Sequence, residues 1–409
     1  MLREDAEIII KEAIRQVMPD EAVVRALEGK EFGSGRIYLV SVGKAAWQMA
    51  KTAEAVLGER IEAGICITKY GHVKGRLNRV RCFEAGHPVP DENSFLAAEE
   101  ALKLTENLQA EDTVIFLLSG GCSALFEKPL VTGAELADIT NRLLACGADI
   151  VETNTIRKRL SGVKGGRFAR HCSPARVYNI ILSDILGDPL DMIASGPACP
   201  DRSTCAQAKA IAEKYGLKLS EGAMVCLEAE TPKELDNVET VVTGSVGNLC
   251  RAAARACETL GYRTSILTDC LDCEAREAGR FLAAVAKSHQ GRSESLAFIA
   301  GGETVVHLTG KGKGGRNQEL ALGAAEGIAG LEHTAVFSVG SDGTDGPTDA
   351  AGGYCDGGTM ERMTRAGVDI YRTLRENDSY EALKKVNGLL FTGATGTNVN
   401  DVAVLLIKR

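Results

Sequence analysis

The sequence lacks the short motifs of several well-known enzyme classes. It has no GxxxxGK[ST] phosphate loop, no GxGxxG turn after its first predicted strand, and no HRD or DFG element. A GxSxG nucleophile elbow is missing, and the six histidines form no HExxH pair. The usual signatures of P-loop enzymes, Rossmann dehydrogenases, protein kinases, α/β-hydrolases and zinc proteases are therefore excluded.

Long apolar runs and an excess of basic charge are also missing. No run approaches the roughly 18–20 apolar residues that span a bilayer, and the N-terminus is charged within five residues. We therefore expect no membrane segment and no secretory signal. The formal net charge of -8 disfavours a nucleic-acid binder, but it leaves room for a local basic pocket that binds a small anion.

Cysteine is plentiful, with 13 residues, but its arrangement does not indicate a disulfide framework. The number is odd, and Cys66, Cys122 and Cys226 lie in apolar runs where a small hydrophobic side chain fits. The single CxxC, Cys270–Cys273, has no second pair at zinc-ribbon spacing. Free structural thiols of this kind are typical of a reducing compartment, so we expect a cytoplasmic protein.

Apolar runs alternate with helical patterns along the first half of the chain. Buried strands are predicted at residues 36–43, 63–71, 114–118 and 178–182, with glycine-containing turns beyond several of them. This βα alternation predicts an N-terminal lobe built on a doubly wound, Rossmann-like parallel sheet. Ligands of such sheets bind at the carboxyl ends of the strands.

A second α/β alternation begins at Val241, after a weak polar linker at residues 230–236. We therefore predict two domains, residues 1–235 and residues 236–409, with a boundary near residue 235. The two α/β lobes are expected to face each other across a cleft that holds the active site.

Candidate site residues follow the predicted strands of the first lobe. Lys44 follows a tight glycine turn and opens a helix, where the helix dipole gives a cation no stabilising role. The segment Ser119-Gly120-Gly121-Cys122-Ser123 repeats the pattern of strand, glycine turn and helix. Asp184 comes just after another strand. All of these positions fall at the carboxyl edge of the predicted sheet.

The second lobe contains the stretch FIAGGETVVHLTGKGKGGRNQELAL, residues 298–322. Its glycine-rich loop could bring backbone N–H groups against an anion, and Arg316 offers planar donors to phosphate or carboxylate. A solvated, flexible hairpin loop is the alternative. A nearby acidic loop, Asp342–Asp349, fits either a complex of a divalent metal with phosphate or a set of Asx turns.

Segments along nearly the whole chain resemble one known family in consistent order. The C-terminal segments are GGETVVHLTGKGKGGRNQELAL, SDGTDGPTDAAGG and LLFTGATGTNVNDVAVLLI. The N-terminal segments are SVGKAAWQMA, GHPVPDENS, LLSGGCSALFEKP, NTIRKRLSGVKGGRFA and ILSDILGDPLDMIASGPACPD. They look like the MOFRL domain and the N-terminal domain of the class II glycerate 2-kinases. The resemblance implies an ATP- and magnesium-dependent enzyme that phosphorylates D-glycerate on its 2-hydroxyl, giving 2-phosphoglycerate.

Carried onto this sequence, the resemblance assigns the family's cleft lysine and arginine to Lys44 and Arg316. We expect both to stabilise the transferring phosphoryl group. The turn of Ser119, Gly120, Gly121 and Ser123 is expected to bind nucleotide phosphates or the glycerate carboxylate. Asp184 and Glu303 are candidates for binding magnesium or for accepting the proton of the substrate hydroxyl. Further substrate or phosphate contacts are expected from Asn154, Arg157 and Asp345.

Other functions stay open beside the glycerate kinase. Some members of the family carry an older label, hydroxypyruvate reductase, although the first-strand turn SVGKAA supplies no dinucleotide fingerprint. A kinase of a related hydroxy acid and a non-catalytic anion-binding module are further alternatives. An unpaired strand edge could support a homodimer.

Overall fold

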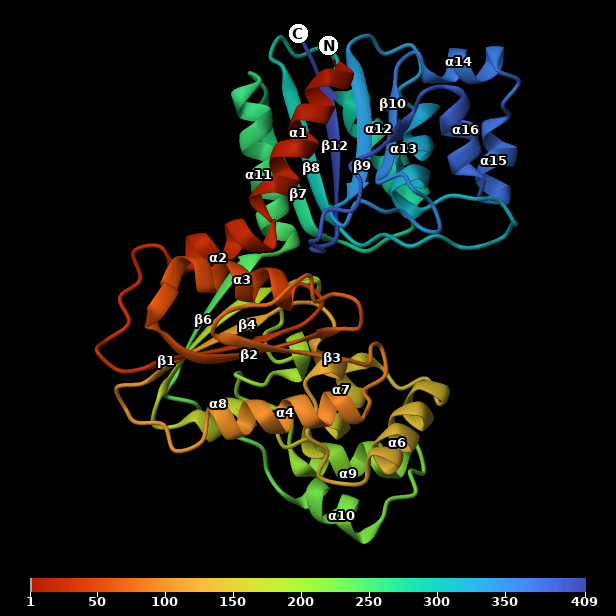
Figure 1. Ribbon diagram of the computed structural model, residues 1–409. Coiled ribbons are helices and arrows are strands. Elements are labelled where there is room, and N and C mark those ends of the chain that lie inside the picture. The colour runs from red at the N-terminus through yellow and green to blue at the C-terminus, as the bar shows by residue number, and fades with distance from the viewer. Residues whose placement is uncertain (1) are drawn as a thin grey trace. The chain divides into compact units, whose positions relative to one another are not determined.

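The computed structural model describes residues 2–409 of the chain (Figure 1). The chain forms two compact units. We call Ala22–Thr243 the N-terminal unit, and residues up to Glu21 together with Gly244–Arg409 the C-terminal unit. Each unit contains one six-stranded sheet with helices packed on it.

The sheet of the N-terminal unit has the strand order β3-β2-β1-β4-β5-β6. Its pairs β1–β2, β1–β4, β2–β3 and β4–β5 are parallel. All residues of β1 and β4 are buried, as expected for strands with helices on both faces. This confirms the predicted doubly wound sheet. The strands are β1 (Ile37–Val42), β2 (Ile61–Lys69), β3 (Val80–Ala85), β4 (Thr113–Leu118), β5 (Arg176–Leu182) and β6 (Val238–Gly244).

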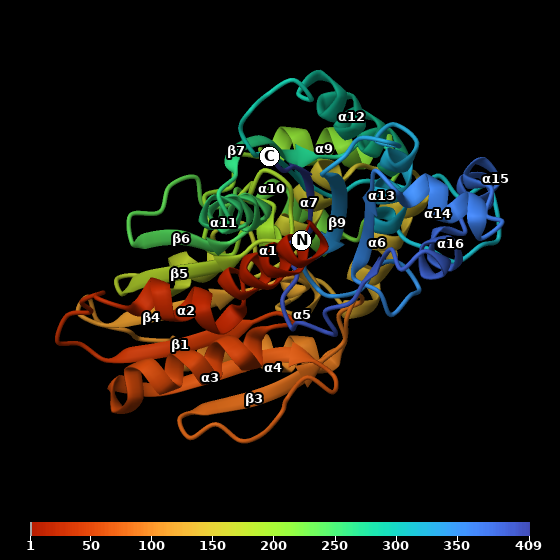
Figure 2. The ribbon, with the colours of Figure 1, turned by 90° about the horizontal axis from the view of Figure 1, so that it is seen from above.

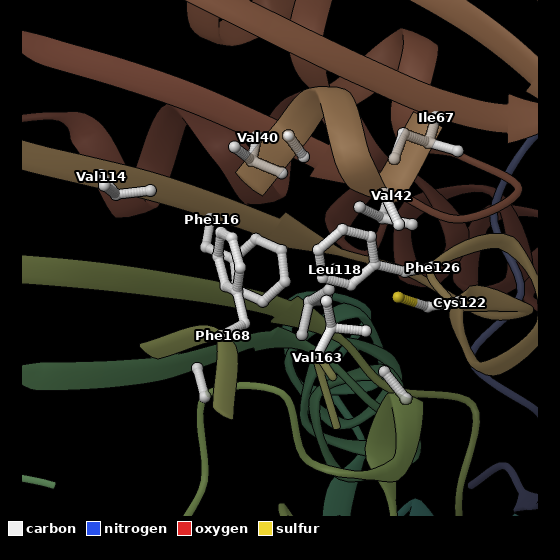
Figure 3. Packing of buried hydrophobic residues seen from close by; sticks show 14 of the residues in the cluster. Val40, Val42, Ile67, Val114, Phe116, Leu118, Cys122, Phe126, Val163 and Phe168 are labelled. Carbon is white, nitrogen blue, oxygen red and sulfur yellow. The ribbon is translucent and has the colours of Figure 1, made fainter. Parts of the chain in front are cut away.

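Two hydrophobic clusters cover opposite faces of this sheet. Alternate residues of β1 divide between them: Leu39 packs with the helices that follow β1, and Val40 packs with those that follow β3 and β4. The second cluster centres on Phe116, Phe126 and Phe168, whose ring centroids lie 4.6 to 5.8 Å apart (Figure 3). The covering helices are α2 (Pro19–Leu27), α3 (Ala46–Leu57), α4 (Glu92–Leu104), α5 (Cys122–Leu125) and α8 (Arg167–Cys172). Two short 3-10 turns, η1 (Gly58–Arg60) and η2 (Ile193–Ser195), lie in the same unit.

Four more helices of the N-terminal unit share a small core of their own. It contains Leu136, Ile156, Ala208 and Leu227, one from each helix. These helices are α6 (Gly133–Ala145), α7 (Ile150–Arg159), α9 (Cys205–Lys214) and α10 (Glu221–Glu228).

The sheet of the C-terminal unit is mixed, with the order β11-β10-β9-β12-β8-β7. The last strand, β12, pairs antiparallel with both β8 and β9, while β7 and β8 are parallel. The strands are β7 (Arg263–Leu271), β8 (Leu296–Gly302), β9 (Thr334–Gly340), β10 (Gly352–Asp356), β11 (Leu389–Leu390) and β12 (Asp401–Ile407).

The C-terminal unit has two prominent pairs of helices and three shorter helices near its end. α1 lies along α11, as Figures 1 and 2 show, and α12 packs on α13. The helices are α1 (Leu2–Gln16), α11 (Val246–Thr259), α12 (Ala275–Ser288), α13 (Arg316–Ala325), α14 (Thr359–Arg365), α15 (Ile370–Glu376) and α16 (Ser379–Lys385).

The division between the units falls at Thr243 and Gly244, whereas the sequence placed a boundary near residue 235. The polar linker precedes β6, and β6 completes the first sheet beside β5. The first helix also belongs with the C-terminal part, because buried Asp5 accepts hydrogen bonds from Tyr262 (2.5 Å) and Lys408 (2.6 Å).

Two further expectations concern membranes and cysteines. No helix within residues 2–409 is long and apolar enough to cross a membrane. All 13 cysteines lie in this range and are free, which agrees with the predicted absence of a disulfide framework.

Candidate active site

The strand order of the first sheet reverses between β1 and β4, and ligands of doubly wound sheets bind beside such a point. The turns after these two strands are joined by hydrogen bonds. The Lys44 amide donates to the Gly120 carbonyl (2.9 Å), and the Ala45 amide donates to Ser119 Oγ (3.1 Å). The predicted Lys44 and Ser119–Ser123 turns therefore form one surface at the carboxyl edge of the sheet.

Three side chains, each from the segment that follows a different strand, lie close to Gly120 and Gly121. A Cβ atom added to Gly120 would lie 2.3 Å from Asp184 Oδ2. One added to Gly121 would lie 2.9 and 3.0 Å from Cδ2 and Nε2 of His87, and 3.3 Å from Lys44 Cε. A Cβ at either position would displace these side chains, and Gly121 also has a left-handed backbone (φ 86°), which favours glycine. The structure thus brings Lys44 and Asp184 to the glycine pair, as predicted, and adds His87, which the sequence analysis missed.

The charge around these glycines is mainly positive. Burial lowers the pKa of His87, and the nearby charges of Lys44, Lys69 and His72 lower it further. The Cys122 thiol behind the turn is no nucleophile, because burial raises its pKa to about 12. An anionic ligand is the natural occupant of such a surface.

Asn154, Arg157 and Ser123 form a second hydrogen-bonded group behind the turn. The Ser195 hydroxyl donates to Asn154 Oδ1 (3.0 Å) and lies 3.2 Å from the Ser123 hydroxyl. Arg157 donates to the Ser123 carbonyl (3.0 Å). Ser195 has a left-handed backbone (φ 60°), which is costly for a residue with a side chain. The predicted residues are therefore brought together, and their visible contacts hold the Ser119–Ser123 turn.

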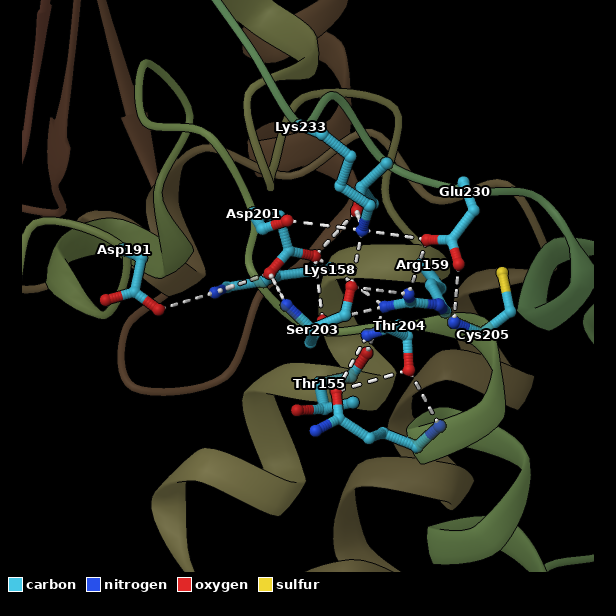
Figure 4. Close-up of polar contacts among 12 residues, drawn as sticks. Thr155, Lys158, Arg159, Asp191, Asp201, Ser203, Thr204, Cys205, Glu230 and Lys233 are labelled. Atoms are coloured by element: carbon cyan, nitrogen blue, oxygen red, sulfur yellow. Dashed lines mark hydrogen bonds and ion pairs between the residues drawn. The ribbon is translucent and has the colours of Figure 1, made fainter.

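The neighbouring basic residues of α7 have a different environment, shown in Figure 4. Lys158 is buried between Asp191 (3.3 Å) and Asp201 (3.2 Å). Arg159 is fully buried and pairs with Glu230 (3.1 Å). These contacts anchor α7 to the segment that follows Asp184, so they support the site without facing it.

In the C-terminal unit, Arg316 is held by two carboxylates. Its Nε and Nη2 donate to Asp401 (2.5 and 3.1 Å), and its Nη1 donates to Glu303 Oε1 (2.8 Å). The structure therefore brings Arg316 and Glu303 together and adds Asp401. Burial raises the pKa of the Asp401 carboxyl, which Arg316 opposes. The side chains of Arg316 and Glu303 are 34% and 46% exposed, so this ion pair can exchange partners.

The side chain of Asp345, from the loop after β9, lies at the N-terminus of α13, the helix that begins at Arg316. Its carboxylate accepts the amides of Asn317 (3.1 Å) and Gln318 (2.9 Å), which the first turn of a helix leaves unpaired. Burial raises the pKa of Asp345 to about 6. Its visible role is to stabilise the helix that carries Arg316.

The glycine-rich loop packs against the segment between α15 and α16. The amides of Thr309 and Gly310 donate to Asn377 Oδ1 (2.8 and 2.9 Å), and the Gly312 amide donates to the Glu376 carbonyl (2.7 Å). A Cβ on Gly310 would lie 2.3 Å from the Glu376 backbone. Close packing against residues 376–378 therefore accounts for the glycines at positions 310 and 312.

The acidic loop contains an Asx turn, because Asp342 Oδ1 accepts the amide of Thr344 (2.9 Å). Asp349 accepts a hydrogen bond from Tyr380 (2.6 Å). Within residues 2–409, no group of three or more His, Cys, Asp or Glu side chains is arranged to hold a metal ion.

A doubly wound sheet with a lysine, a glycine pair and a carboxylate beside its switch point defines this chain as an α/β protein, and such an arrangement is typical of sheets that bind small ligands at this edge. Residues 5–228 match DUF4147, a domain of unknown function, and residues 296–401 match the MOFRL family. The chain belongs to the DUF4147/MOFRL family of glycerate 2-kinases, since it is 51% identical to the D-glycerate 2-kinase of Thermotoga maritima over 98% of this chain and 97% of the relative.

Other relatives are similar to this chain over nearly its whole length. The glycerate 2-kinase of Pyrococcus horikoshii is 42% identical, with 99% of this chain and 97% of the relative covered. A putative hydroxypyruvate reductase of Agrobacterium vitis is 39% identical over 98% of this chain and 93% of the relative. The crystal structure of the Thermotoga maritima glycerate kinase superposes with a TM-score of 0.95 at 50% identity, covering 99% of both chains.

Proposed function

We propose that this protein is a D-glycerate 2-kinase, which transfers a phosphoryl group from ATP to the 2-hydroxyl of D-glycerate and gives 2-phosphoglycerate. The observation that carries the proposal is the 51% identity to the D-glycerate 2-kinase of Thermotoga maritima over nearly the whole chain. The anion-binding surface at Gly120 and Gly121 supports it.

The proposed mechanism depends on positioning and charge neutralisation, as phosphoryl transfer generally does. Lys44 neutralises charge on the transferring group, and the Ser119–Ser123 turn binds oxygens of the nucleotide or the glycerate carboxylate. Asp184 accepts the proton of the substrate hydroxyl or binds magnesium. Arg316, oriented by Asp401, stabilises the phosphoryl group through the side of its guanidinium that Glu303 now contacts.

Magnesium would neutralise charge on the nucleotide phosphates. Protein sites for Mg²⁺ on nucleotides commonly use one or two carboxylates, with phosphates and water completing the shell. Asp184 beside Gly120 and the exposed Glu303 are carboxylates of the kind required, so we propose them as its ligands. The cytoplasmic location and the homodimer stay predictions from the sequence.

The test is a turnover assay with D-glycerate, ATP and magnesium, coupled to enolase. Enolase consumes 2-phosphoglycerate directly, so we expect signal without added phosphoglycerate mutase. A signal that requires the mutase would mean phosphorylation at the 3-hydroxyl. Absence of ADP release would overturn the proposal.

Lys44→Ala tests the site within the same assay. Loss of one preorganised charge contact should lower kcat/KM by about 10²–10³-fold. Lys51→Ala is the matched control, because Lys51 lies on α3 with its ammonium 5.4 Å from the Trp47 ring. Normal kinetics in Lys44→Ala would remove this lysine from the mechanism.

The second candidate function is that of a hydroxypyruvate reductase, because two relatives from Agrobacterium vitis are named putative hydroxypyruvate reductases. A reductase needs a dinucleotide site, and the turn between β1 and α3 carries Gly43-Lys44-Ala45 in place of a GxGxxG fingerprint. Oxidation of NADH on addition of hydroxypyruvate would establish this second function.

A further inference from the structure

His87 is an ionisable side chain beside the glycine pair to which the proposed mechanism assigns no role. It follows β3 in the turn Gly86-His87-Pro88, whereas Ser119 follows β4, and β2 and β1 lie between these two strands in the sheet. Within residues 2–409, neither ring nitrogen of His87 hydrogen-bonds to a protein group. A partly buried imidazole without a partner calls for a ligand or a water.

The ring of His87 lies over Gly121. A Cβ on Gly121 would come within 3.0 Å of His87 Nε2 and within 3.3 Å of Lys44 Cε. The imidazole and the lysine stem thus share the space above one glycine. A ligand atom that reaches Lys44 at this point is within range of a hydrogen bond from the imidazole.

The groups around His87 determine its protonation. Lys44 comes from the turn after β1, and Lys69 and His72 come from the end of β2 and the turn beyond it. Partial burial and, to a smaller extent, their positive charge lower the pKa of His87, which favours the neutral imidazole. A neutral imidazole carries one N–H donor and costs less to desolvate than a cation.

We propose that His87 is a further substrate-contacting residue, whose Nε2–H donates a hydrogen bond to an anionic oxygen bound over Gly121 beside Lys44. The oxygen belongs to a carboxylate or a phosphate group. This inference rests on the proposed kinase function for the identity of the ligand, which is D-glycerate or the nucleotide. The contact itself depends only on an oxyanion at this position.

Kinetics of two His87 variants test the contact. His87→Leu removes the donor and keeps much of the volume, whereas His87→Gln places an amide N–H near the position of Nε2. We expect His87→Leu to lower kcat/KM about 10–100-fold, and His87→Gln to recover most of it. A KM raised for D-glycerate alone identifies the carboxylate, and one raised for ATP alone identifies the nucleotide phosphates.

The matched control is His307→Gln, because the His307 side chain is 71% exposed in the other unit. Its kinetics should match those of the unaltered protein. A kcat/KM of His87→Leu within twofold of that of the unaltered protein would overturn the proposal. Equal losses in His87→Leu and His87→Gln would also overturn it, because they would indicate a packing role.

A second measurement does not depend on turnover. The His87 imidazole is titrated by NMR with and without inorganic phosphate, and its signal is assigned from His87→Gln. An anion at Nε2 favours the imidazolium, so phosphate should raise the pKa of His87 by about 0.5–1 unit. Identical titrations would overturn the contact even if kinase activity is present. A phosphate-dependent shift without kinase activity would support the contact and refute the function.

Discussion

Replacing Glu127 or Lys164 singly should destabilise the N-terminal unit strongly, because the two form a fully buried ion pair. Lys164 donates to Glu127 Oε2 (2.5 Å) and to the Phe126 carbonyl (3.1 Å), and both side chains are 0% exposed. Burial lowers the pKa of Lys164, and Glu127 opposes that shift. The second oxygen of Glu127 has no hydrogen-bond partner, so the pair is desolvated at an appreciable cost.

The magnitude follows from removing one charge and leaving the other. At 2.5 Å and an effective dielectric constant of about 20, the attraction is roughly 6–7 kcal/mol, which desolvation of both ions largely offsets. Glu127→Leu or Lys164→Met loses the attraction and retains one desolvated ion, at a cost of about 3–5 kcal/mol. The double variant retains neither ion and leaves only the Phe126 carbonyl unpaired, which costs about 1–3 kcal/mol.

The assay is urea unfolding followed by the fluorescence of Trp47, the one tryptophan of the chain. Trp47 is 8% exposed, lies on α3 and donates to the Gly75 carbonyl (2.9 Å), so it reports on the N-terminal unit. We expect the double variant to be more stable than either single variant. A double variant as unstable as the sum of the two single ones would refute the coupling, and single effects below about 1 kcal/mol would refute the buried pair.

Two predictions concern the C-terminal unit. Gly310→Ala should lower the free energy of unfolding by about 1–3 kcal/mol, because the added methyl group overpacks on Glu376, and should expose the loop to trypsin. Gly291→Ala is the control, because no atom lies within 4 Å of its added methyl group. Equal trypsin resistance of the two variants would contradict the packing argument. Asp345 has its pKa raised from 3.8 to about 6, so its contribution to stability is fully present below pH 3.8 and is lost as the pH rises through 6. Between pH 3.8 and 6, the free energy of unfolding of the unaltered unit should fall by up to about 1.4 kcal/mol per pH unit relative to that of Asp345→Asn. Hydrogen exchange of α13 measures this difference, and parallel pH profiles of the two proteins would contradict it.

The first sheet could be predicted from the sequence because the patterns that define its strands and helices lie in neighbouring residues. Each βα unit contains its own apolar strand, turn and helix, and strands buried on both faces are continuous apolar runs such as β1 and β4. The positions of Lys44 and Asp184 could be predicted for the same reason, since each lies two residues beyond the end of a strand. The carboxyl edge of a parallel sheet then brings them together without knowledge of any side-chain contact.

Features that depend on distant segments could not be predicted. Asp401 holds Arg316 from 85 positions away, and only the insertion of β12 between β8 and β9 brings them together. His87 lies in the segment GHPVPDENS, but its place over Gly121 depends on the order of β3, β2, β1 and β4 in the sheet. The glycine-rich loop has the composition of a phosphate cradle, and the need for glycine comes from the backbone of Glu376 instead.

The membership of α1 in the C-terminal unit has a consequence for the order in which the protein is made. During translation, α1 emerges before Ala22–Thr243. Its partners, which are α11, Tyr262 and Lys408, emerge after the whole of that segment. At about 5–20 residues per second, that interval alone takes on the order of ten to forty seconds. The apolar face of the newborn helix stays uncovered during this time, while the N-terminal unit can already fold. The N-terminal unit can therefore form before the C-terminal unit, which is complete only after Gly244–Arg409 has been made.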